Sequence, residues 1–422
     1  MRYSAFAILK NALRGNRDWV PAWRKPEPRS TYDVIIVGGG GHGLSTAFYL
    51  ASVHGITNVA VIEKGYLGSG NVGRNTTIVR SNYRLTPNSG FYEKSMELWR
   101  ELSHALNYNV MFSPRGVLNL AHTPGQMDTH AERGNQMRLM GVQSELLDRD
   151  QVARLNPGLD VSGSARFPVH GGLLQPDAGN ARHDAVAWGY ARAADQLGVD
   201  ILENTEVVGF LKDGERIAGV EVMRNGEPME IRAAKTAVAV AGNTGRVMKM
   251  AGVDKLPIET TVLQAFVSES IKPIIPTVTT FGAGHLYVSQ SDKGGLVFGG
   301  NIDYYNSYAQ RGNLPVWEEV TGELIAMFPA FARLRLLRCW GGVMDMSMDG
   351  SPIIATGPLP GMYLNAGWCY GGFKATPASG WCFAHTIAND KAHRLNEAFT
   401  LERFKDGNPI DELGAGPTPW YH

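Results

Sequence analysis

Cysteine is scarce in this sequence of 422 residues. The three cysteines, Cys339, Cys369 and Cys382, have no paired spacing. A disulfide-dependent secreted domain needs a richer framework, so the count favours a reducing compartment, and we expect a cytoplasmic protein. The cysteines also lack the spacing and neighbouring ligands of a metal site, and none is expected.

An excess of one sign of charge is also missing. Lysine and arginine number 40 and aspartate and glutamate 40, so the formal net charge is zero. Nucleic-acid-binding chains are usually strongly basic, and we therefore expect no nucleic-acid partner. No apolar run approaches the roughly 18–20 residues that span a bilayer, so no membrane segment is expected either.

Apolar residues and glycine, in contrast, are plentiful. Hydrophobic residues make up 44% of the chain, which suffices for sizeable cores and excludes disorder for most of it. At roughly 100–200 residues a domain, the length predicts two or three domains. The 50 glycines are unusual, and several of them cluster where a backbone could approach a ligand closely.

The first 30 residues form a basic arm, with seven basic and two acidic side chains. Phe6, Leu9 and Leu13 would share one face of a helix. Lys10 interrupts the apolar stretch that a secretory signal needs, which disfavours a targeting peptide. Two interpretations stay open: a surface arm, or an arm that docks on a partner subunit.

A dinucleotide-binding motif follows the arm. Residues 32–37 read as a buried parallel strand, six residues rich in glycine come next, and residues 44–53 are helical. Gly38, Gly40 and Gly43 have the spacing for a tight turn around a pyrophosphate at a helix N-terminus. Glu63 ends a second strand 20 residues past Gly43, where a carboxylate accepts hydrogen bonds from a ribose.

A second glycine turn indicates which dinucleotide is bound. Gly371 and Gly372 follow a predicted strand at 361–366 and precede a helix expected from about Thr376. A helix N-terminus there would stabilise the anionic reduced form of a flavin ring. This arrangement favours FAD over NAD. An NAD-dependent dehydrogenase remains an alternative. The colour of the purified protein separates the two, because a flavoprotein is yellow and an NAD-binding protein is not.

Six stretches of the chain carry a family resemblance: the opening arm and residues 32–43, 63–65, 73–83, 181–189 and 371–374. In this order they resemble the beta subunits of heterotetrameric sarcosine oxidases, which lie within the glycine-oxidase-like flavoproteins. The resemblance runs over essentially the whole chain. It implies oxidative demethylation of sarcosine to glycine, with non-covalent FAD at the amine-oxidising site.

The resemblance also implies a second flavin and several partners. FMN would be covalently attached to His183, and electrons would pass from FAD to FMN and then to O2, giving H2O2. The methyl carbon would pass to tetrahydrofolate in a partner subunit. Alpha, gamma and delta subunits would complete the heterotetramer, with NAD and folate sites expected on alpha.

The predicted fold class is α/β (α+β overall): a Rossmann-type FAD-binding domain with an inserted, mainly antiparallel-sheet substrate domain. Residues 31–85, about 160–250 and 345–410 would form the FAD-binding domain. About 86–160 and 251–344 would form the substrate and second-flavin domain, between the arm at 1–30 and a tail at 411–422.

By match to the family's motifs, two residues would act in catalysis: Arg80 and Lys374. The residues expected to bind the cofactors are Gly38, Gly40, Gly41, His42, Gly43, Glu63, Lys64, Asn71, Arg74, Thr76, Ile78, His183, Val208, Gly371, Gly372 and Lys374. A guanidinium suits bidentate capture of an amino-acid carboxylate, which is the role expected of Arg80. His285 could lie near FMN, whereas Asp345 and Asp349 are expected to be structural.

One departure from the family pattern leaves the substrate open. Tyr370 replaces an expected threonine in the second glycine turn and would lie close to the flavin or substrate. Another secondary or tertiary amine, such as dimethylglycine, proline or a different N-methyl amino acid, is therefore an alternative. A further alternative is an electron-transfer subunit of a larger dehydrogenase, against which the paired Arg80 and Lys374 argue.

Overall fold

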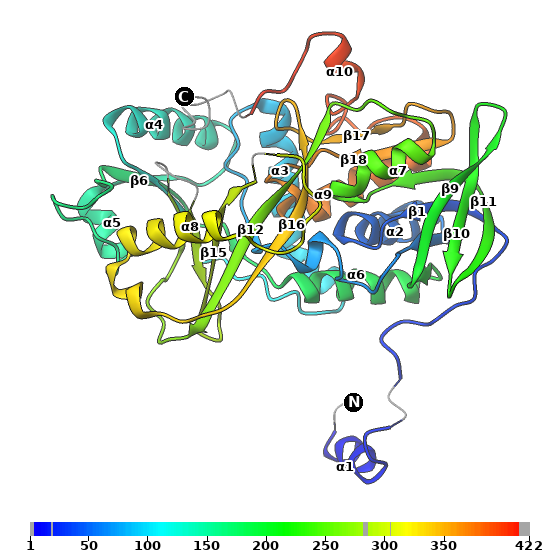
Figure 1. Cartoon of the computed structure of the whole chain (residues 1–422), viewed down its shortest axis with the longest axis horizontal. Coiled ribbons are helices and arrows are strands. Elements are labelled where there is room, and N and C mark those ends of the chain that lie inside the picture. Colours follow the sequence, from blue (N-terminus) through cyan, green and yellow to red (C-terminus); the bar gives the residue numbers. More distant parts are fainter. Residues whose placement is uncertain (1–3, 18–19, 282–285, 304, 413–422) are drawn as a thin grey trace.

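The computed structural model describes residues 4–17, 20–281, 286–303 and 305–412. Two eight-stranded sheets form separate parts of the molecule, each covered by helices, with the N-terminal arm extending away from both (Figure 1). One sheet has a parallel centre and the other is mainly antiparallel. This arrangement confirms the predicted α/β class with a Rossmann-type domain.

The first sheet has the order β17-β18-β11-β1-β2-β8, and β9 and β10 extend it from β11. Its strands are β1 (Thr31–Val37), β2 (Val59–Ile62), β8 (Asp200–Leu202), β9 (Thr205–Asp213), β10 (Arg216–Arg224), β11 (Glu227–Val238), β17 (Ile353–Thr356) and β18 (Met362–Ala366). β1 pairs in parallel with both β2 and β11. Its last four residues are buried because both faces of the sheet are covered, which suits a run of β-branched side chains.

Four helices cover one face of this sheet: α2 (Gly41–His54), α3 (Thr86–Ala105), α6 (His183–Gln196) and α9 (Gly372–Asn389). α2 packs against both α6 and α9, so the two glycine turns that start α2 and α9 lie near each other. The other face packs against α7 (Thr244–Met250), α10 (Glu402–Lys405) and the β9–β10 hairpin.

The second sheet has the order β16-β12-β15-β14-β13-β4-β6-β5. Its strands are β4 (Val117–Ala121), β5 (Glu145–Asp148), β6 (Gly171–Gln175), β12 (Ile258–Ser270), β13 (Val278–Thr280), β14 (Tyr287–Gln290), β15 (Gly295–Ile302) and β16 (Leu336–Ser347). α8 (Leu314–Met327) packs on the stacked Phe266 and Phe298, while α4 (Pro124–Leu139) and α5 (Arg149–Leu155) cover the β4–β6 end.

The position of β6 differs from the predicted domain division. It falls within the stretch of about 160–250 expected in the FAD-binding domain, yet it pairs with β4 and β5 of the second sheet. The chain returns toward the first sheet through β7 (Gly179–Asn180), which pairs with β3 (Ile78–Val79). α3 also differs, because it falls within the stretch of about 86–160 expected in the substrate domain and packs on the first sheet instead. The other domain limits remain a prediction. His285 and residues 413–422 of the predicted tail lie outside the described residues.

The N-terminal arm carries one helix, α1 (Ala5–Leu13), which has no buried residue (Figure 1). Several side chains near residues 23–29 attach the arm to the rest of the protein: Arg24 donates to Asp195 at 2.8 Å, Trp23 donates to Glu203 at 3.1 Å, and Arg29 pairs with Asp200 at 3.0 Å. Phe6 and Leu13 are at least 80% exposed, so the predicted apolar face is present and uncovered. Among the described helices, none combines the length and apolarity required to cross a membrane.

Candidate active site

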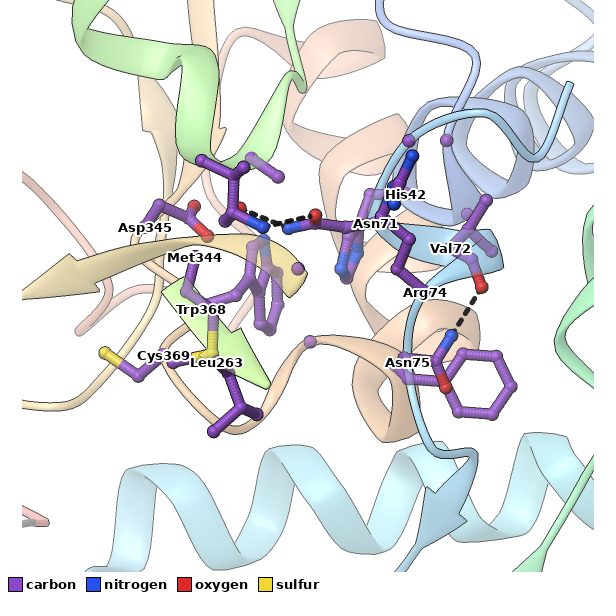
Figure 2. A pocket seen from close by; sticks show the side chains of 18 of the residues that line it. His42, Asn71, Val72, Arg74, Asn75, Leu263, Met344, Asp345, Trp368 and Cys369 are labelled. Atoms are coloured by element: carbon purple, nitrogen blue, oxygen red, sulfur yellow. Dashed lines mark hydrogen bonds between the residues drawn. The ribbon is translucent and has the colours of Figure 1, made fainter. Parts of the chain in front are cut away.

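A cavity of about 920 Å³ lies between the two sheets. Its walls come from the carboxyl ends of β1 and β2, the two glycine turns, and strands β12, β14 and β16 of the second sheet. A volume of this size suits a large organic ligand, and the carboxyl ends of parallel strands are where such ligands bind. Figure 2 shows part of the lining.

The first glycine turn has room for a ligand on one side and none on the other. Gly38 has a φ of +111°, and a Cβ there would lie 2.3 Å from the carbonyl oxygen of Ala239. A Cβ on Gly43 would lie 1.9 Å from the carbonyl oxygen of Gly38, so this glycine permits close packing of helix on strand and does not line the cavity. A Cβ on Gly40 would meet nothing within 4 Å. Gly40 therefore borders open space at the N-terminus of α2, whereas a Cβ on Gly41, which also lines the cavity, would lie 3.2 Å from the hydroxyl oxygen of Thr376.

Glu63 lies at the end of β2 beside this turn. Its carboxylate accepts hydrogen bonds from the backbone N–H groups of Gly39 at 3.0 Å and Gly65 at 2.9 Å. These bonds fix the carboxylate at the cavity wall next to Lys64. Because an ionised carboxylate has about four acceptor sites, it retains capacity for the hydroxyls of a ribose.

The loop at residues 69–78 connects the first sheet with the second. Asn71 donates to the carbonyl oxygen of Val343 in β16 and accepts from the N–H of Val343 at 3.0 Å (Figure 2). Arg74 donates to Gln310 at 3.0 Å, and its carbonyl accepts from Trp340 at 2.6 Å. Thr76 and Ile78 line the cavity with these two residues.

His42 and Trp368 join the two glycine turns. Their rings stack with centroids 4.3 Å apart and an interplanar angle of 10°. The Nδ1 atom of His42 lies 2.8 Å from the hydroxyl of Ser379. Burial lowers the pKa of His42 to about 3, so the ring is neutral at physiological pH and adds no charge to the cavity.

The second glycine turn brings Lys374 into the cavity. α9 begins at Gly372, and Lys374 lies in its first turn, only 6% exposed. Burial first, and the charge of Arg80 second, lower the pKa of Lys374 well below its usual value. Gly372, Tyr370 and Lys374 line the cavity, whereas Gly371 lies behind it, where a Cβ would come 2.0 Å from the hydroxyl of Tyr92.

Arg80 follows β3 and lines the same cavity as Lys374. It donates a hydrogen bond to Asn82, and its guanidinium carbon lies 5.0 Å from the centre of the Tyr83 ring. These contacts orient the side chain without neutralising it. The structure therefore brings the two predicted catalytic residues together at the end of the cavity that the second glycine turn forms.

Besides Gly43 and Gly371, two further expected cofactor residues lie outside this cavity. His183 begins α6, and the nearby Ala181 N–H donates to the carbonyl of Thr77, a cavity residue, at 3.1 Å. Val208 is 44% exposed on β9, and its neighbour Val207 lines the cavity instead. Because side chains alternate along a strand, the side chain of Val208 points away from the cavity, and its role in binding the cofactor stays a prediction.

Asp345 and Asp349, both expected to be structural, have different surroundings. Asp349 is paired with Arg403 at 2.7 Å, and both side chains are buried, so its role is structural. Asp345 lines the cavity and accepts from the N–H of Gly367 at 2.6 Å. Burial raises its pKa to about 6. Asp345 lies in β16 and Asp349 just after its end, and nothing in the local sequence distinguishes the two carboxylates.

The residues present fit a dinucleotide that carries a second ring system. One end of the cavity offers the glycine turn, free N–H groups and Glu63, and the other offers Lys374, Arg80 and the N-terminus of α9. Open space beside Gly40 and the ligand-sized volume match a pyrophosphate and two ring systems. Fold and cavity together define an oxidoreductase that uses a dinucleotide of the FAD kind.

Comparison with known proteins agrees with this class. The family model described as FAD dependent oxidoreductase matches residues 33–386. Sarcosine oxidase subunit beta of Rhizobium meliloti (strain 1021) is 61% identical over 422 residues, covering the whole of both chains. The chain therefore belongs to the sarcosine oxidase beta-subunit family within the FAD-dependent oxidoreductases.

Two further proteins are similar over most of their length. Sarcosine oxidase subunit beta of an Arthrobacter species is 51% identical, covering 93% of this chain and 96% of that one. The crystal structure of L-proline dehydrogenase from P. horikoshii superimposes with a TM-score of 0.83 at 27% identity, covering 91% of this chain and 100% of the other. Family and fold are thus those that the sequence predicted.

Proposed function

We propose that this chain oxidises the secondary amine of sarcosine with non-covalently bound FAD. The observation that carries the proposal is the placement of Arg80 and Lys374 in the same cavity as the dinucleotide turn. The names of the similar beta subunits support sarcosine as the substrate. The overall reaction would convert sarcosine, O2 and tetrahydrofolate to glycine, H2O2 and methylenetetrahydrofolate.

The chain's own residues would supply binding and orientation. Bound FAD would supply the two-electron oxidant: the N-methyl carbon of the substrate would lose a hydride (one proton with two electrons) and the amine nitrogen one proton. Arg80 would hold the substrate carboxylate with two parallel N–H donors, aided by Lys374. Fixing the substrate beside the second glycine turn would remove much of the entropic barrier, a contribution of up to about 7–11 kcal/mol. The N-terminus of α9 would stabilise negative charge in its neighbourhood.

The second flavin of the proposal is FMN on His183. Burial lowers the pKa of His183, so its ring is mainly neutral near pH 7 and has a lone pair available for a covalent bond. The pairing of β3 with β7 ties this segment to Ile78 of the FAD cavity. A flavin on His183 would thus lie on a segment attached directly to that cavity, where it could receive electrons and pass them to O2.

Alpha, gamma and delta subunits would complete a heterotetramer, with the NAD and folate sites on alpha. The names of the similar subunits support an assembly of several chains. The uncovered apolar face of α1, flanked by basic residues, would dock on one of these subunits. Because all three cysteines are free, the cytoplasmic location remains consistent with the sequence, as a prediction.

A larger amine is the second candidate substrate, and Tyr370 is the observation that favours it. Tyr370 lines the cavity four residues before Lys374, where its size alters the space beside the flavin-facing turn. Dimethylglycine, proline and other N-methyl amino acids are the compounds to compare. The ratio of kcat/KM between sarcosine and each of them decides between the candidates.

Two measurements test the proposal. Acid precipitation of the purified protein should leave flavin in both the pellet and the supernatant, one covalent and one free. Arg80→Ala should raise KM for sarcosine about 10- to 100-fold while leaving FAD bound. A colourless protein, or an unchanged KM, would contradict the assigned cofactor or the assigned role of Arg80 respectively.

A further inference from the structure

Arg133 is a cavity residue for which the proposed function has no use. It lies on α4, which covers the second sheet, and lines the cavity with Arg80 and Lys374. Within the described part of the chain it makes no hydrogen bond or ion pair, and its Nε atom is buried without a partner. The side chain as a whole is partly buried. Because an unpaired donor at a buried atom is costly, a guanidinium held in this way indicates an anion-binding position.

Among the residues that the structure describes, no acidic group near Arg133 is free to neutralise it. Its pKa is lowered to about 10 by burial and then by Arg80 and Arg84, so it remains charged at physiological pH. Glu412 lies near enough to interact, but its carboxylate accepts from the N–H groups of Arg84 at 2.6 Å and Leu85 at 3.1 Å. The charged groups nearest to Arg133 are therefore mainly cationic.

The acids that line the rest of the cavity are Glu63, Glu206 and Asp345. The Glu63 carboxylate accepts from the first glycine turn, and the Asp345 carboxylate accepts from the N–H of Gly367. Glu206 lies on β9. The cation of Lys374 already donates to the carbonyl of Tyr370 at 2.6 Å. Arg80 likewise gives one donor to Asn82. Within the described residues, Arg133 is thus the cation of this end that has no partner and can offer all of its donors to a bound anion.

We propose that Arg133 binds the substrate carboxylate together with Arg80. It would supply a second guanidinium from α4, the helix that covers the second sheet. This inference rests on the proposed function, because it assigns the carboxylate of that same substrate. The substrate class is then a small amino acid whose carboxylate lies between two guanidinium groups, with its amine toward the second glycine turn.

His130, one helical turn before Arg133, supports this division of roles. It is 9% exposed, its Nε2 lies 3.3 Å from the carbonyl oxygen of Leu120, and its pKa is lowered to about 4. The ring is therefore neutral, with Nε2 donating to that carbonyl and Nδ1 left as an acceptor without a partner. Arg133 alone supplies charge from this face of α4 to the cavity.

The test uses the flavin-containing holoenzyme and three variants. Arg133→Gln removes the charge, Arg133→Lys keeps it without the bidentate geometry, and Arg138→Gln is a matched control from the exposed face of the same helix. Acetate, a carboxylate without an amine, is titrated while the flavin absorbance is followed. KM and kcat are measured for sarcosine and for its neutral amide.

Arg133→Gln should weaken acetate binding and raise KM for sarcosine about 10- to 100-fold, with kcat changed less than about threefold. Arg133→Lys should recover part of the loss, Arg138→Gln should match the unaltered protein, and turnover of the amide should not respond to any variant. Unchanged acetate affinity in Arg133→Gln overturns the inference. Failure of the unaltered enzyme to oxidise sarcosine contradicts the proposed function instead, and the acetate titration still reports on Arg133.

Discussion

Lys374 donates a hydrogen bond from Nζ to the carbonyl oxygen of Tyr370, 2.6 Å away and four residues earlier in the chain. This bond fixes the amine at the start of α9, where the second glycine turn meets the cavity. The same position buries the amine and exposes it to the charge of Arg80, both of which lower its pKa. A lysine in this state titrates in a range that an ordinary lysine does not reach.

The first prediction concerns the pH dependence of substrate binding. Because the pKa of Lys374 is lowered, its positive charge is lost as pH rises through a value well below about 10.4, and KM for sarcosine should increase there. Arg80→Gln removes a like charge and should move this increase to higher pH. Lys374→Arg should abolish it. Measuring KM between about pH 6 and about pH 10 in the three proteins shows where each increase occurs. If Lys374→Arg had the same pH profile as the unaltered protein, the prediction would be contradicted.

The second prediction separates two glycines of one motif. Gly43→Ala would place a Cβ 1.9 Å from the carbonyl oxygen of Gly38, so we expect a loss of about 3 kcal/mol or more in stability. Gly40→Ala meets nothing within 4 Å in the protein and should leave the unfolding temperature of the flavin-free chain nearly unchanged while weakening FAD binding. Thermal unfolding and flavin titration of both variants distinguish the two roles. Equal unfolding temperatures would refute the packing role of Gly43.

The third prediction tests the second flavin. His183 does not line the FAD cavity, so His183→Ala should eliminate acid-stable flavin while the amount of extractable FAD stays the same. Fluorescence of the acid-precipitated pellet, compared with that of the supernatant, measures both. Asp184→Asn at the adjacent helix position is a suitable control, since it keeps the imidazole. A fluorescent pellet from His183→Ala would rule out this attachment site.

The fourth prediction follows from Asp345. Its pKa in the folded protein, about 6, is above the usual value of 3.8, so folding favours the protonated form. The resulting penalty is absent at low pH and grows as pH rises from about 4 through about 6. As pH rises from about 4 to neutrality, the unaltered protein should therefore lose about 2–3 kcal/mol of stability relative to Asp345→Asn. Denaturant titrations of both at low and neutral pH, with flavin bound, provide the comparison; a constant difference would contradict the shift.

Motifs that combine a strand, a glycine turn and a helix could be predicted closely. Tyr32–Val37 and Glu63 lie where the spacing placed them, because local hydrogen bonding and burial on both faces determine that unit. The start of α9 was less accessible, since Pro377 suggested a helix from about Thr376. The helix begins four residues earlier, at Gly372, and includes Pro377 in its interior.

The far wall of the cavity could not be predicted from local pattern. Arg133 lies on a helix whose sequence is mostly polar, and its proximity to Arg80 depends on how the second sheet packs against the first. Asp345 resembles Asp349 in sequence, yet one faces the cavity and the other an arginine. Val208 shows a further limit, because neighbouring residues of a strand point in opposite directions and the local sequence does not tell which of them faces a ligand.

The bidentate attachment of Asn71 to the backbone of Val343 has a consequence for how much folded protein a cell holds. The loop at residues 69–78 follows a strand of the first sheet, and β16 belongs to the second. A ligand that contacts both therefore adds its binding energy to the folding equilibrium of the entire chain. At a free flavin concentration 100 times Kd, this linkage is worth about 2.7 kcal/mol. The supply of flavin would therefore regulate the abundance of the subunit as well as its activity.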